Sequence, residues 1–134
     1  MQENTLLHRQ IHPTFVINEL VASQAFSTTK LVASSAFTPT ANDRDQLSVY
    51  NGDKFSPKES HAHYTQLYQS FGVLSLTVAE VVAMEPLKAM EDSIPFDGHC
   101  FIDFSEIGSK TQKAKKAGLL RDLAVARDWT YLPE

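Results

Sequence analysis

The chain has 134 residues, of which 43% are hydrophobic and 21% charged, and its formal net charge is -4. These values are typical of one globular domain spanning residues 1–134, and the acidic balance argues against a general nucleic-acid-binding protein. The single cysteine, Cys100, excludes an intramolecular disulfide. No signal-peptide pattern and no apolar run of the ~20 residues that span a membrane is found. We therefore expect a cytoplasmic protein that does not associate with membranes.

The first segments of the chain predict short strands. Leu6–Ile11 is the first strand candidate, and Pro13 interrupts it. Residues 15–17 and 20–26 then predict a hairpin around the pair Asn18-Glu19. The spacing of the alanines and valines in the second half also suits a helix, because apolar residues recur there at helical intervals.

A near-repeat follows in this region. The segment LVASQAFSTT occupies residues 20–29 and LVASSAFTPT occupies residues 31–40, with seven of ten positions identical. Two copies are too few for a solenoid, which needs at least three units. We expect two equivalent strands, either neighbours in one sheet or a duplicated edge strand or loop, and the role of the repeat stays open.

The middle of the chain combines a strand, a turn and a helix start. Residues 47–50 alternate as a strand should, and Asn51-Gly52 is a strong turn signal. Ser56, Pro57 and Glu59 form a helix-opening pattern with a capping box. Apolar side chains at helical spacing predict that this helix continues toward Gly72, with one face formed by Tyr64, Leu67, Tyr68 and Phe71.

The last segments alternate strands with helices. Residues 73–76 predict a strand, and Thr77 with Glu80 forms a second capping box for a short helix. Residues 85–97 predict an acidic connection with two prolines, and residues 98–104 predict a strand. That strand places Cys100, Ile102 and Phe104 on one face, so we expect a structural thiol. Residues 105–129 predict the longest helix, with Ser109 and Gln112 as its capping box, before a short strand at 129–132.

This order of elements predicts an α+β fold. Strands dominate the first third of the chain, and helices alternate with strands afterwards. We expect a mixed, largely antiparallel sheet that is covered mainly on one face by two or three helices, the longest at the C-terminus.

Charge is unevenly distributed along the chain. Residues 109–127 contain six of the twelve Lys and Arg residues but one of the sixteen Asp and Glu residues. Cations near a helix N-terminus are unfavourable by about 0.3–1 kcal/mol each. Four lysines lie in the first two turns of the predicted helix, where they form either a solvated face or a site for an anion or an acidic partner: Lys110, Lys113, Lys115 and Lys116. A complementary acidic face is predicted at Glu85, Glu91, Asp92, Asp97 and Asp103.

The segregated charge favours a small protein that binds another macromolecule. An inhibitor, an antitoxin or immunity-type partner, or an accessory subunit would each have this character. We expect the partner to be another protein, with nucleic acid as a less favoured choice and self-association left open. No cofactor is predicted, because the chain carries no glycine-rich phosphate loop.

The alternative hypothesis is an enzyme that acts on NAD or on nucleic acid. An early arginine, a following serine and a late glutamate resemble, in order alone, the site of an NAD-using ADP-ribosyltransferase. That resemblance implies that Arg9 or His12 orients the dinucleotide, Ser34 supports the site and Glu106 polarises the ribose or its acceptor. Tyr50 is a further candidate at a strand end, whereas His8, Arg9, His12 and the lysines would suit an RNase-like site. If these side chains converge in one pocket, the enzyme hypothesis is favoured.

Histidines occur in two spacings that could suggest a site, one as His61 with His63 and one as His99 with Asp103. His61 and His63 are two residues apart on the predicted helix, so their side chains point about 200° apart. We therefore predict no metal site. His99 and Asp103 share one face of the predicted strand, but their Cα atoms lie about 13 Å apart. They either lie on a polar or loop-covered face, which is the favoured interpretation, or flank a pocket, but they cannot form a direct hydrogen bond.

Overall fold

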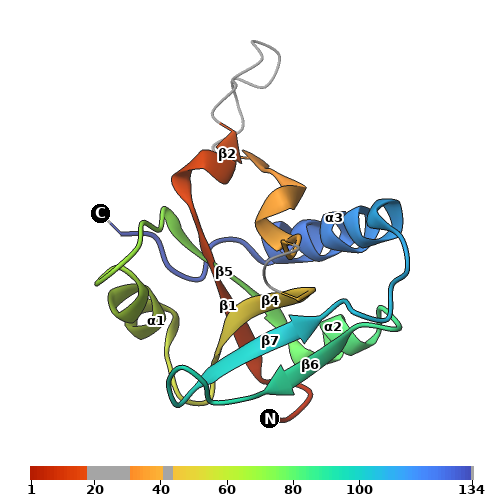
Figure 1. Cartoon of the computed structure of the whole chain (residues 1–134). Coiled ribbons are helices and arrows are strands. Elements are labelled where there is room, and N and C mark those ends of the chain that lie inside the picture. Colours follow the sequence, from red (N-terminus) through yellow and green to blue (C-terminus); the bar gives the residue numbers. More distant parts are fainter. Residues whose placement is uncertain (18–30, 41–43, 134) are drawn as a thin grey trace.

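The computed structural model describes residues 1–17, 31–40 and 44–133. Its main sheet has five strands in the order β5-β1-β4-β7-β6, and every pairing is antiparallel (Figure 1). The strands are β1 (Leu6–Ile11), β4 (Gln46–Asn51), β5 (Gly72–Thr77), β6 (Lys88–Glu91) and β7 (His99–Asp103). A separate two-stranded sheet pairs β2 (Val16–Ile17) with β3 (Leu31–Val32).

Three α-helices complete the fold and confirm the predicted α+β class. They are α1 (Pro57–Tyr64), α2 (Val78–Val82) and α3 (Lys110–Arg127), the longest of which lies nearest the C-terminus. Short 3₁₀ helices cover residues Pro13–Phe15 (η1) and Ser34–Phe37 (η3). None of the helices in the described part of the chain is long and apolar enough to cross a membrane.

The core lies between the sheet and the long helix α3. Leu7 and Ile11 of β1, Ile102 of β7 and Leu120 of α3 are at most 1% exposed. Phe37 of η3 is fully buried in the same cluster, and η3 packs against α3 (Figure 1). Burying each of these side chains contributes about 1.5–3 kcal/mol, so this layer supplies much of the driving force for folding.

The predicted capping boxes are confirmed at α1 and α2, and at α3 the Ser109 side-chain cap is confirmed. At α1, the Ser56 side chain accepts from the Glu59 N–H, and the Glu59 carboxylate accepts from the Ser56 N–H. Thr77 and Glu80 form the same reciprocal pair at α2. At α3, Ser109 accepts from the Gln112 N–H. These bonds satisfy backbone donors that the first helical turn leaves without partners.

The predicted extension of α1 toward Gly72 is wrong. The helix ends at Tyr64, and the side chains of Leu67 and Tyr68 are 81% and 62% exposed. Gly72 opens β5 instead of closing a helix, because β5 pairs along the full length of β1. A Cβ at Gly72 would lie 2.6 Å from a Leu132 methyl carbon, so the glycine allows the C-terminal segment to approach β5.

Two further predictions need correction. Residues 85–97 are not a simple connection, because β6 forms within them and pairs with β7. The second copy of the near-repeat is a two-residue strand followed by the 3₁₀ helix η3, and the first copy lies outside the described residues. β2 pairs with β3, and residues 20–26 of the predicted hairpin lie outside the described part.

Strand β1 carries a buried histidine, His8. His8 is 1% exposed, with Nδ1 2.7 Å from the Ser75 hydroxyl and Nε2 3.0 Å from the Phe55 carbonyl oxygen. Because the carbonyl only accepts, Nε2 carries the proton and Nδ1 accepts from Ser75. Burial lowers the pKa of His8, and the bond to Phe55 opposes this shift in part. The folded protein therefore holds His8 as the neutral imidazole.

This histidine predicts a loss of stability in mild acid. Above its ordinary pKa of 6.5, His8 is neutral in the folded and unfolded states, and its neutral contacts stabilise the fold fully. Below that value the unfolded chain binds a proton that the folded chain resists, so the free energy of unfolding falls. Urea denaturation at pH 7 and pH 5 should show a smaller pH dependence for His8→Gln than for the wild type. An equal pH dependence in His8→Gln and in the wild type would contradict this account.

Candidate functional site

The candidate site lies where β1 and β4 separate. The two strands pair at only two positions, Leu7 with Asn51 and His8 with Tyr50. Beyond this point Arg9 bridges the gap between them. Its Nε donates to the Ala36 carbonyl oxygen at 2.8 Å, and its Nη1 donates to the Ser48 carbonyl oxygen at 3.0 Å. The guanidinium therefore links β1 to β4 through Ser48 and to η3 through Ala36.

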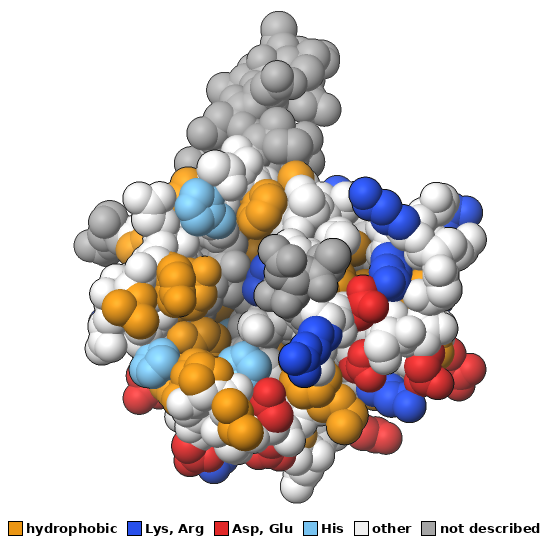
Figure 2. Space-filling view, viewed as in Figure 1, with side chains coloured by type: hydrophobic (Ala, Val, Ile, Leu, Met, Phe, Trp, Pro, Cys, Tyr) orange, Lys and Arg blue, Asp and Glu red, His pale blue; other side chains and the backbone are white. Residues whose placement is uncertain are grey.

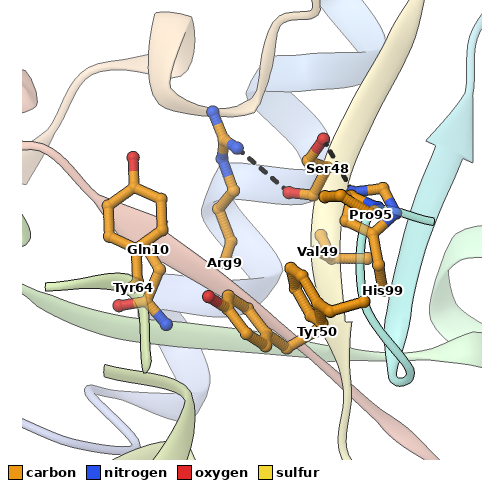
Figure 3. Close-up of a pocket in the computed structure, with 9 residues that line it drawn as sticks. Arg9, Gln10, Ser48, Val49, Tyr50, Tyr64, Pro95 and His99 are labelled. Atoms are coloured by element: carbon orange, nitrogen blue, oxygen red, sulfur yellow. Dashed lines mark hydrogen bonds between the residues drawn. The ribbon is translucent and has the colours of Figure 1, made fainter. Parts of the chain in front are cut away.

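A pocket of about 210 Å³ opens at this gap. Its lining combines the β1–β4 gap with the last residue of α1 and the loop before β7 (Figure 3). The Arg9 and Tyr50 side chains lie between Tyr64 on one side and Ser48 and Pro95 on the other (Figure 3). The full lining comprises Arg9, Gln10, Ser48, Val49, Tyr50, Tyr64, Pro95, Phe96 and His99.

Aromatic rings form one wall of the pocket. Tyr50 packs against Phe96 with ring centroids 5.1 Å apart, and Phe55 and His63 complete the cluster behind them. The Tyr50 hydroxyl lies 2.8 Å from His63 Nδ1. Burial raises the pKa of Tyr50, so its phenol stays protonated at neutral pH. Such a wall can stack against a planar ring without providing a charge.

The polar side of the pocket contains a chain of hydrogen bonds that the sequence analysis missed. The Ser48 hydroxyl lies 3.1 Å from His99 Nε2, and His99 Nδ1 lies 2.6 Å from an Asp92 carboxylate oxygen. Ser48 is exposed, whereas the side chains of His99 and Asp92 are 14% and 29% exposed. Ser48 and His99 come from neighbouring strands, so no local sequence motif could reveal their contact.

The structure brings together two of the five candidate catalytic residues. Arg9 and Tyr50 both line the pocket. His12 caps η1 through a bond from the Thr14 N–H, and Ser34 begins η3. Glu106 forms a 2.8 Å ion pair with Lys88. None of these last three belongs to the pocket lining, so the five candidates do not form one site.

The predicted charged faces are partly engaged in local pairs. Lys113 pairs with Asp45 at 2.8 Å, whereas Lys110 and Lys115 are exposed on the first turns of α3 and Lys116 is half-buried. Figure 2 shows Lys and Arg side chains on the side of α3 and hydrophobic side chains on the side of α1. In the predicted acidic face, Asp92 bonds to His99 and Asp97 forms an ion pair with Lys54. Glu91 lies 3.7 Å from the N-terminal ammonium, and Asp103 accepts a hydrogen bond from the Ser105 N–H. Glu85 is exposed.

The remaining polar candidates have structural contacts. His61 Nε2 lies 3.2 Å from the Ser70 carbonyl oxygen, whereas His63 contacts Tyr50. Within residues 1–17, 31–40 and 44–133, no three His, Cys, Asp or Glu side chains gather closely enough to hold a metal ion. Cys100 is fully buried, and burial raises the pKa of its thiol to about 12. It is therefore a thiol rather than a reactive thiolate at neutral pH.

Comparison with protein-family models, with curated proteins and with solved structures finds no match to this chain.

Proposed function

We propose that the protein is an enzyme that acts on a small substrate with a planar aromatic group, bound in the pocket between β1 and β4. One observation carries this proposal: Tyr50, Tyr64 and Phe96 line the same opening as Gln10, Ser48 and His99. A mostly apolar concave site with a few polar groups is the usual form of a small-molecule site. Its volume of about 210 Å³ is below that of pockets for drug-sized ligands, so it suits a one- or two-ring group.

Binding of small planar probes tests this proposal. Saturation-transfer NMR with adenosine, nicotinamide and benzamide should detect binding of at least one probe to the wild-type protein. Tyr64→Ala should weaken that binding by roughly tenfold, because stacking on one aromatic side chain contributes about 1–3 kcal/mol.

Leu67→Ala is the matched control for this experiment. Leu67 is 81% exposed, lies three residues after Tyr64 and does not line the pocket, so its removal should leave affinity unchanged. Equal binding by both variants, or no binding of any probe by the wild type, would remove the pocket as the ligand site.

A second candidate function is the binding of an acidic protein surface by α3. The exposure of Lys110 and Lys115 on its first turns favours this alternative. Their positive charge adds to the positive end of the helix dipole, which attracts anionic groups. A protein partner bound in this way would contact the opposite side of the molecule from the hydrophobic surface near α1 (Figure 2).

A further inference from the structure

The hydrogen-bond chain in the pocket has the order carboxylate, imidazole, hydroxyl. Asp92 follows β6, His99 begins β7, and Ser48 lies in the middle of β4. The two distances are 2.6 Å from Asp92 to His99 Nδ1 and 3.1 Å from His99 Nε2 to the Ser48 hydroxyl. Figure 3 shows the Ser48 hydroxyl directed toward the His99 ring. A nucleophile, a base and a group that orients the base are therefore placed in sequence.

The hydrogen-bond partners of His99 determine which of its ring nitrogens carries the proton. An ionised carboxylate only accepts, so Asp92 fixes the proton of the neutral ring on Nδ1. The lone pair of Nε2 is then directed at Ser48, whose hydroxyl donates to it. This is the tautomer in which a histidine takes a proton from a serine as general base.

The position of Ser48 is fixed on two sides. Its carbonyl oxygen accepts from Arg9 Nη1, and β4 pairs with β7 at Ser48 and Phe101. Ser48 and His99 both line the pocket, so the bond between them opens onto the space where a substrate would lie. An ordinary polar pair between neighbouring strands needs neither a partly buried carboxylate behind the histidine nor a pocket in front of the serine.

We propose that Ser48 is a nucleophile activated by His99 and Asp92, which accepts the acyl group of a small aromatic ester. This proposal rests on the proposed function, because the aromatic part of the ester occupies the same pocket. Arg9 acts as a positioning residue through the Ser48 carbonyl oxygen.

The reaction proceeds through two balanced steps. The Ser48 oxygen bonds to the ester carbonyl carbon, its proton passes to His99 Nε2, and the carbonyl electron pair moves to the oxygen. When this intermediate collapses, the bond to the alcohol oxygen breaks, and the alcohol leaves with the proton from His99. Water then attacks the acyl group with His99 again as base, which releases the carboxylic acid and restores the Ser48 hydroxyl.

Covalent capture by phenylmethanesulfonyl fluoride tests the nucleophile directly. The Ser48 oxygen would displace fluoride from sulfur, with the serine proton passing to His99. Intact-protein mass spectrometry and peptide mapping of the full chain should show one adduct, located on Ser48. Ser48→Ala should abolish that adduct, and Asp92→Asn should slow its formation at least about tenfold, because the histidine loses its fixed tautomer.

Ser35 provides an internal control, since it is an exposed serine outside the pocket lining. Labelling of Ser35 as fast as Ser48, no adduct at Ser48, or an unchanged rate in Asp92→Asn would each overturn the inference. Probe binding by Ser48→Ala separates the two proposals, because the aromatic wall is intact in this variant. Binding without Ser48 labelling in the wild type would reject the nucleophile and retain the pocket, whereas absent binding would reject the pocket itself.

Discussion

Gly52→Ala should destabilise the protein by about 2–3 kcal/mol, because a side chain at this position overlaps the backbone of β1. The Gly52 N–H donates to the Leu6 carbonyl oxygen at 2.7 Å, and an added Cβ would overlap that same oxygen. Backbone atoms of a central strand cannot move aside without disturbing the β1–β4 pairing. Urea denaturation, with the midpoint and slope compared with those of the wild type, measures this effect.

Gly118→Ala is the matched control for Gly52→Ala. Gly118 lies inside α3, and an added Cβ would have no neighbouring atom within 4 Å. The same chemical change should therefore stabilise the protein by about 0.5–1 kcal/mol through helix propensity. Equal effects of the two substitutions would contradict the close approach of Gly52 to Leu6.

Arg9→Lys should lower the free energy of unfolding by about 2 kcal/mol and weaken ligand binding in the pocket. The Arg9 guanidinium spans two carbonyl oxygens, those of Ala36 and Ser48. A lysine ammonium is a single point and cannot reach both, so at least one of these two bonds is lost. Urea denaturation together with the NMR binding assay measures both consequences.

Arg121→Lys is the control for this change. Arg121 lies on α3, where it pairs with the neighbouring Asp122 and makes one 3.3 Å bond to the Val32 carbonyl oxygen. Its replacement should change stability by less than about 0.5 kcal/mol and leave binding unaltered. A wild-type stability for Arg9→Lys would show that the two guanidinium bonds to Ala36 and Ser48 do not stabilise the fold.

The elements predicted correctly depend on short-range signals. The alternation around Cys100, Ile102 and Phe104 predicts a strand with one buried face, and all three side chains are fully buried. The caps at Ser56, Thr77 and Ser109 are likewise local patterns. These signals are reliable because each involves residues within four positions of one another.

The pocket depends on contacts that are distant in sequence. The alternation of β7 places His99 on the same face as Asp103, whereas in the structure His99 bonds to Asp92 across the turn before β7 and to Ser48 on β4. The second contact spans 51 residues and follows from the β4–β7 register, which no single segment specifies. The sequence predicts Arg9 and Tyr50 in a site with His12, Ser34 and Glu106. In the structure both residues line the pocket, because β1 and β4 separate there.

The most direct test of the pocket is a map of backbone amide chemical shifts in ¹⁵N-labelled protein as the best-bound planar probe is added. We expect the largest shifts at Ser48, Val49 and Tyr50 of β4, at Tyr64, and at Phe96 and His99 beside the aromatic wall. Shifts confined to Lys110–Lys116 on α3, or spread evenly over the surface, would contradict a ligand site between β1 and β4.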